Sequence, residues 1–115
     1  MKADNHLESA EEFEKDAIKL NENPPLHYRG IISCIFHAIH HYIAYGLEKR
    51  GIAHTDKHAG VSRLLREKNY EEVANLFTKM DSLRHGRVYG GKGNGETVKL
   101  AFEILDEVKK WAIKN

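Results

Sequence analysis

The segment 83–90, Leu-Arg-His-Gly-Arg-Val-Tyr-Gly, carries the side chains best suited to bind an anion. No carboxylate lies between Asp81 and Glu96. The cationic or titratable residues of the segment and of the loop that follows are Arg84, His85, Arg87 and Lys92. An arginine side chain can hold a phosphate group through two parallel hydrogen bonds. The same charges would also stabilise the negative end of a helix dipole, so a phosphate-binding surface and a solvated helix end both stay open.

A second group of titratable residues consists of His37, His40 and His41. His37 and His41 would lie one turn apart on one face of a helix, and this spacing can ligate zinc. Ala38 stands where a His-Glu-x-x-His motif requires glutamate. Two ligands one turn apart are too few for a closed tetrahedral site. The pattern therefore favours histidines hydrogen-bonded inside a bundle or at a dimer face, with a His-rich metal-binding bundle as the alternative.

Three alternating glycines, Gly91, Gly93 and Gly95, precede an expected helix. Backbone amides at a helix N-terminus can bind a phosphate. However, no strand is expected before these glycines, and their spacing matches neither the dinucleotide-binding nor the P-loop motif. The glycines therefore favour a connector between two helices.

The elements that position these residues are predicted by apolar side chains recurring at steps of three to four residues. We expect helices over residues 1–21, over 25–50, over a short segment capped by Thr55 or Asp56, from a cap at Asn69 through Leu83, and from 94 onward. Asn69 is expected to end the third helix and, with Glu72, to cap the fourth, and Asn94 to cap the last. Gly51 is a suitable left-handed residue after the second helix. No segment alternates as a strand does, so we predict an all-α, up-and-down bundle of about five helices, as a single domain over 1–115.

The second predicted helix is apolar on nearly every side. Its apolar residues are Ile31, Ile32, Ile35, Phe36, Ile39, Tyr42, Ile43 and Leu47. Such a helix lies at the centre of a bundle or under a partner subunit. We therefore expect a homodimer. In the last helix the stripe expected to face the core comprises Val98, Ala101, Phe102, Leu105, Val108 and Ala112.

Composition limits the class of protein. The formal net charge of +1 over 115 residues gives no global attraction to a polyanion. Cys34 is the only cysteine, which excludes an intrachain disulfide and suits a reducing compartment. The apolar stretch around 31–43 is interrupted by histidines and is too short to span a membrane. The N-terminal residues are acidic and lack the apolar core of a signal peptide, so we expect a cytoplasmic location.

Several segments resemble HEPN-domain proteins. The run 28–41, Tyr-Arg-Gly-Ile-Ile-Ser-Cys-Ile-Phe-His-Ala-Ile-His-His, and its continuation 47–52 resemble the second helix of that family. The segment 58–61, His-Ala-Gly-Val, resembles the opening of its next, short helix. Residues 84–89 fall where the family places its arginine motif. The resemblance covers about residues 24–114.

The resemblance implies a small helical bundle that forms homodimers, often encoded beside a nucleotidyltransferase in a toxin–antitoxin module. Active members are metal-independent ribonucleases that need no cofactor, and two copies of their motif meet across the dimer interface. Arg84 matches the arginine of the motif and His85 the adjoining polar position. Tyr89 stands where the catalytic histidine is expected. Tyrosine is a poor base near neutral pH, so either His85 replaces the missing histidine or the site binds without cutting.

The function expected from the sequence is that of a HEPN-type RNA- or nucleotide-binding subunit. Arg84, His85 and Tyr89 are the candidate catalytic residues, and Arg84, Arg87 and Lys92 are the candidate phosphate ligands. Tyr89 would stack on a base. A non-catalytic subunit that only regulates a nucleotidyltransferase partner is an alternative. A metal-binding bundle that uses His37, His40 and His41 is the other.

Overall fold

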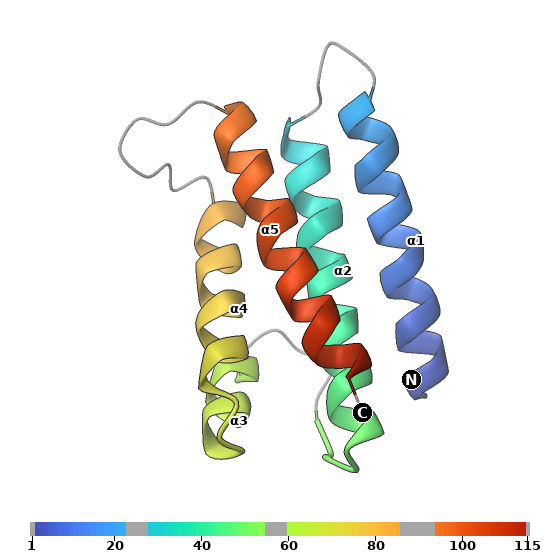
Figure 1. The fold of residues 1–115 in the computed structure, drawn as a ribbon, viewed down its shortest axis with the longest axis vertical. Coiled ribbons are helices and arrows are strands. Elements are labelled where there is room, and N and C mark those ends of the chain that lie inside the picture. The colour runs from blue at the N-terminus through green and yellow to red at the C-terminus, as the bar shows by residue number, and fades with distance from the viewer. Residues whose placement is uncertain (1, 23–27, 55–59, 86–93, 115) are drawn as a thin grey trace.

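The computed structural model describes residues 2–22, 28–54, 60–85 and 94–114, which contain five helices and no strand. The helices are α1 (Ala3–Glu22), α2 (Tyr28–Lys49), α3 (Val61–Glu67), α4 (Glu71–Arg84) and α5 (Asn94–Ile113). The four long helices lie alongside one another, and successive long helices run in opposite directions (Figure 1). The short helix α3 lies beside the beginning of α4. The predicted all-α, up-and-down bundle is confirmed.

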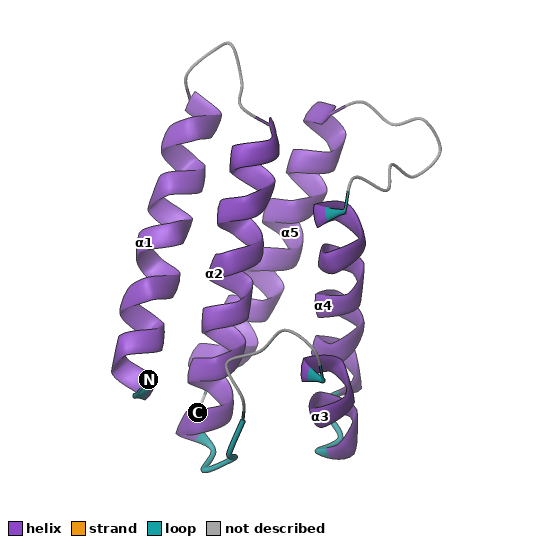
Figure 2. Cartoon of the chain, turned by 180° about the vertical axis from the view of Figure 1, so that it is seen from behind, coloured by secondary structure: helices purple, strands orange, loops and turns teal. Residues whose placement is uncertain are grey.

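Helix α2 occupies the centre of the bundle. It packs against α1, α4 and α5, as the view from behind also shows (Figure 2). The eight apolar residues expected on this helix are each at most 8% exposed within the single chain. The apolar surface of α2 is therefore covered by the chain's own helices, and it gives no reason to expect a dimer. A homodimer stays a prediction that rests on the HEPN resemblance alone.

The buried side chains of all five helices form one hydrophobic cluster. In α5 the predicted stripe is confirmed for its buried members, Val98, Ala101, Leu105, Val108 and Ala112. Phe102 differs, because it is only partly buried at the edge of this cluster. None of the described helices is long and apolar enough to cross a membrane.

The end of α2 is fixed by Gly51, which has the left-handed φ of 74°. Its N–H donates to the carbonyl of Glu48 at 2.9 Å, and the N–H of Ile52 donates to the carbonyl of Leu47 at 2.9 Å. These two bonds form a Schellman motif and satisfy carbonyls that the helix leaves unpaired. The predicted role of Gly51 is confirmed.

The expected start of α3 is wrong. The residue before its first turn is Gly60, with φ 88° and no side-chain cap, so neither Thr55 nor Asp56 caps the helix. Those two residues lie outside the described parts of the chain. Gly60 can take up the left-handed backbone at little steric cost, and this allows the chain to enter the helix at Val61.

Asn69 takes only one of its two expected roles. It ends α3 with φ 68°, and the N–H groups of Asn69 and Tyr70 donate to the carbonyls of Arg66 and Leu65 at 3.1 and 2.8 Å. The N-cap of α4 is Tyr70, and no side chain caps that end. The predicted capping box is therefore wrong, because Asn69 is already used in the turn that closes α3. Helix α5 begins at Asn94, whose side-chain role lies outside the described residues.

Candidate functional site

Arg84 and His85 lie together where α4 ends. Arg84 is the last residue of the helix, and His85 is its C-cap. Their side chains are 34% and 51% exposed, so both reach solvent. The other predicted site residues, Arg87, Tyr89 and Lys92, lie outside the described parts of the chain. Of the predicted site, the structure therefore places Arg84 and His85 side by side.

The guanidinium of Arg84 is held by two neighbours. Its Nη2 and Nε donate to Oδ1 of Asp81 at 3.0 and 3.3 Å. Its Cζ lies 4.3 Å from the centroid of the buried Phe36 ring, within the range of a cation–π contact. An exposed ion pair of this kind contributes about 0–1 kcal/mol. An incoming phosphate could therefore displace Asp81 at small cost while Phe36 still supports the arginine.

His85 is oriented by the backbone of α4. Its Nδ1 lies 2.9 Å from the carbonyl oxygen of Asp81. Because a carbonyl only accepts, Nδ1 must carry the proton, and in the neutral ring Nε2 then presents a lone pair. That Nε2 lies 3.5 Å from Nη2 of Arg84. A proton acceptor and a guanidinium cation therefore share one small surface.

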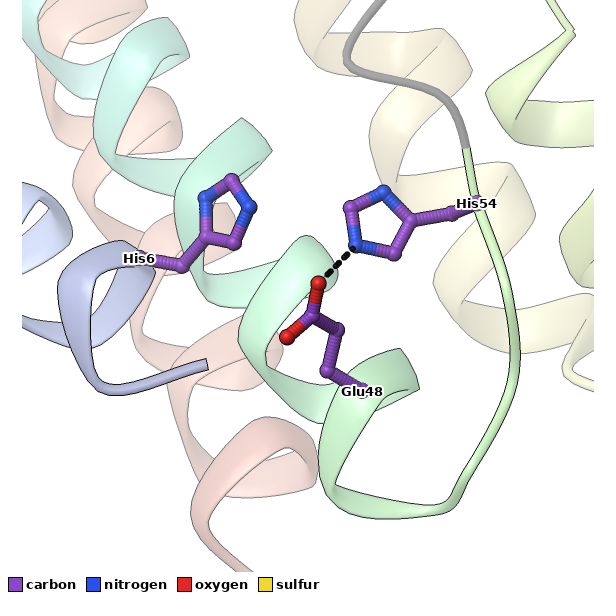
Figure 3. A group of neighbouring side chains, drawn as sticks. All are labelled: His6, Glu48 and His54. Carbon is purple, nitrogen blue, oxygen red and sulfur yellow. Dashed lines mark hydrogen bonds and ion pairs between the residues drawn. The ribbon is translucent and has the colours of Figure 1, made fainter. Parts of the chain in front are cut away.

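A second group of side chains gathers at the other end of the bundle (Figure 3). His6 comes from the first turns of α1, Glu48 from the last turn of α2, and His54 from the segment that follows α2. One potential metal-binding atom of each residue lies within 4.8 Å of those of the other two. Nε2 of His54 lies 3.1 Å from Oε1 of Glu48. We call these three residues the His6 cluster.

The His6 cluster is largely withdrawn from water. His6 is 1% exposed, and the side chains of His54 and Glu48 are 7% and 29% exposed. A further histidine supports it, because Nδ1 of His6 lies 2.9 Å from Nδ1 of His41. In this hydrogen bond the Nδ1 of one ring donates and the Nδ1 of the other accepts, so the protonation of the two rings is linked.

His37, His40 and His41, which the alternative metal-binding bundle would use, do not form a group of three ligands in the described structure. His37 and His41 both lie against Phe13. The centroids of their rings are 5.1 and 5.8 Å from the centroid of the Phe13 ring. His40 is 7% exposed and lines a cavity that His54 also borders. Within the described parts of the chain, the group that could hold a metal ion is the His6 cluster. The alternative metal site on His37, His40 and His41 is therefore not supported, because helical spacing identifies only ligands on one helix. The contact between His41 and His6 instead agrees with the favoured interpretation of histidines hydrogen-bonded inside the bundle.

Comparison with known proteins identified no relative: no protein-family model, curated protein or solved structure matches the chain. The HEPN resemblance accordingly stays a prediction.

Proposed function

We propose that this chain is a HEPN-type RNA-binding subunit whose binding surface lies where α4 ends. The observation that carries the proposal is the adjacency of Arg84 and His85, both exposed and both oriented by Asp81. The resemblance supplies the ligand class, because residues 84–89 fall where HEPN proteins place the arginine of their RNA site.

The chemistry of the surface suits a phosphodiester. Arg84 would hold a phosphate oxygen pair through its planar fork, which lysine cannot copy. Arg87 and Lys92 would add charge, and Tyr89 would stack on a base. His85 presents Nε2 next to Arg84, where it can exchange a proton with a ribose hydroxyl.

The proposal includes an assembly that the resemblance implies. Two copies of the chain would form a homodimer in which their arginine segments meet, in the cytoplasm and paired with a nucleotidyltransferase-type protein. The buried α2 means that such an interface would have to use other surfaces of the bundle.

Binding of a fluorescein-labelled single-stranded RNA, measured by anisotropy at two salt concentrations, tests the proposal. Arg84→Ala should weaken binding and lower the dependence on salt by about one phosphate contact. Arg63→Ala is the matched control, because Arg63 is also an exposed arginine paired with a carboxylate, that of Glu67 at 3.2 Å. Equal RNA affinity in wild-type protein and in folded Arg84→Ala would overturn the site.

A further inference from the structure

We propose that the His6 cluster is a binding site for a divalent transition-metal ion, with zinc as the best match. The three ligands would come from three parts of the chain: His6 at the beginning of α1, Glu48 near the end of α2, and His54 beyond it (Figure 3). The proposal is independent of RNA binding, because Arg84 is the last residue of α4 and α4 ends at the opposite end of the bundle from the start of α1 and the end of α2 (Figure 1).

The distances suit a small ion after side-chain rotation alone. Zinc binds imidazole and carboxylate at about 2.0–2.2 Å, so two ligands of a tetrahedral site lie roughly 3.3 Å apart. His54 and Glu48 already have this spacing, with 3.1 Å between Nε2 and Oε1. The ligand atoms of the whole group lie within 4.8 Å of one another. The largest adjustment is therefore on the order of 1.5 Å, which rotation about side-chain bonds can supply.

The ligand types select the class of metal. Two imidazoles and one carboxylate are a known zinc ligand set, in which water takes the fourth position. Calcium and magnesium prefer oxygen ligands only, so a site with two nitrogens disfavours them. The negative charge of Glu48 offsets half of the charge of a divalent ion.

His41 is not one of the three ligands, but it would hold His6 in the orientation that the ion requires. Metal-bound histidines are held in position by a hydrogen bond at their other ring nitrogen. His6 has such a contact, because its Nδ1 lies 2.9 Å from Nδ1 of His41. The ligand atom of His6 is then Nε2, which is buried. His41 is therefore a positioning residue for the ion, not a ligand.

A bound ion would join the beginning of α1 to the end of α2. A ligand that binds only the folded state raises its stability, and the gain grows with ligand concentration. Zinc should therefore raise the thermal midpoint of the protein. The increase in stability should be largest in the first turns of α1, because His6 is the ligand that α1 contributes.

Isothermal titration of the untagged full-length chain with zinc chloride, after removal of metal with a chelator, tests the site. We expect one ion per chain and an increase in the thermal midpoint. Glu48→Gln keeps the shape of the side chain and should weaken zinc binding at least about tenfold. Glu67→Gln is the control, since Glu67 is an exposed residue of α3 that pairs with Arg63.

Cobalt substitution gives a second readout that does not depend on stability. The visible absorption of bound Co²⁺ should appear in the wild-type chain and in His37→Gln, and it should be lost in His54→Gln. A wild-type chain that binds zinc more weakly than about 10 μM would overturn the proposal. Unchanged zinc affinity in Glu48→Gln would overturn it as well, because the ion would then lie on other histidines.

Discussion

Gly46 and Trp111 are in direct contact across the interface between α2 and α5. A Cβ atom at position 46 would stand 2.5 Å from Cζ3 of Trp111 and 3.2 Å from Cα of Ala112. The indole also lies against Arg50, whose Cζ is 4.3 Å from the centroid of the ring. The two helices can approach this closely only because residue 46 has no side chain.

Gly46→Ala should therefore destabilise the protein, although alanine favours a helix by about 1 kcal/mol over glycine. Overpacking of this kind costs about 1–3 kcal/mol, because the bulky indole must move. Urea denaturation followed by circular dichroism measures the change. Gly95→Ala is the matched control, since a Cβ in that position of α5 meets nothing within 4 Å. Equal stability of Gly46→Ala and wild-type protein would show that α5 shifts freely here.

Leu105→Asp should be among the most damaging single changes. Leu105 is 2% exposed in the core, and a carboxylate there would lose its hydration without gaining a partner. We expect a loss of about 3–5 kcal/mol, or no folded protein at all. Ile113→Asp, which places the same change at a 46% exposed position of the same helix, should shift the thermal midpoint only slightly. A midpoint in Leu105→Asp close to that of wild-type would mean that α5 is rotated.

The fold could be predicted where it depends on local sequence. The buried stripe around Leu105 recurs every three to four residues, so its face of α5 follows from helical geometry. Gly51 likewise marks the end of α2 through its own backbone freedom. Asn69 shows where prediction from local sequence fails, because the same residue type suits both the end of one helix and the N-cap of the next. Only the packed chain decides between two such roles.

The His6 cluster and the packing of Gly46 against Trp111 depend on contacts between distant residues, and these could not be predicted. Gly46 and Trp111 are 65 positions apart, and His6 and His54 are separated by the whole of α2. The sequence did indicate Arg84 and His85, because they are neighbours in the chain. Nothing in their spacing predicted that Phe36 would support the guanidinium.

The stability of the protein should fall in alkaline solution because of Tyr42. Its hydroxyl donates to Oε1 of Glu14 at 2.6 Å. The pKa of Tyr42 is raised, first by burial, then by this hydrogen bond and by the charges of Glu14 and Glu11. The folded state therefore favours the protonated phenol. The stabilisation is complete below the ordinary tyrosine pKa of about 10 and is lost as the pH rises from there toward the folded-state value.

Urea denaturation at pH 8 and at pH 11 measures this effect. Tyr42→Phe should be less stable than wild-type by about 1 kcal/mol at pH 8, because it lacks the hydrogen bond to Glu14. Between the two pH values it should lose less stability than wild-type protein, since phenylalanine has no proton to release. Parallel losses in both proteins would assign the alkaline sensitivity to other groups, such as the lysines.

The proposed homodimer should be visible by light scattering at micromolar concentration. We expect twice the mass of the 13.2 kDa chain, with an interface of about 1,200 Å² or more. A monomer under these conditions would rule out an RNA site shared between two chains. Each chain would still present its own surface around Arg84.

The sharpest prediction concerns His85 and separates binding from cleavage. We expect the wild-type chain to bind single-stranded RNA without cutting it, because Tyr89 stands where the resemblance places a catalytic histidine. The measurement is a gel of end-labelled RNA after long incubation with the chain in buffer containing a chelator. His85→Ala should then bind RNA with little change, because its phosphate anchor, Arg84, keeps its contacts with Asp81 and Phe36.

Cleavage by the wild-type chain would overturn this prediction and make His85→Ala the decisive variant. Breaking RNA without a metal needs a base for the ribose hydroxyl and an acid for the leaving oxygen. His85 is the imidazole that lies beside Arg84 in the described part of the chain, and its contact with the carbonyl of Asp81 leaves the lone pair on Nε2. Cleavage that disappears in His85→Ala while binding persists would identify a ribonuclease whose general base is His85, the neighbour of Arg84, and not a residue at position 89. Cleavage that persists in His85→Ala would place the base outside the described end of α4.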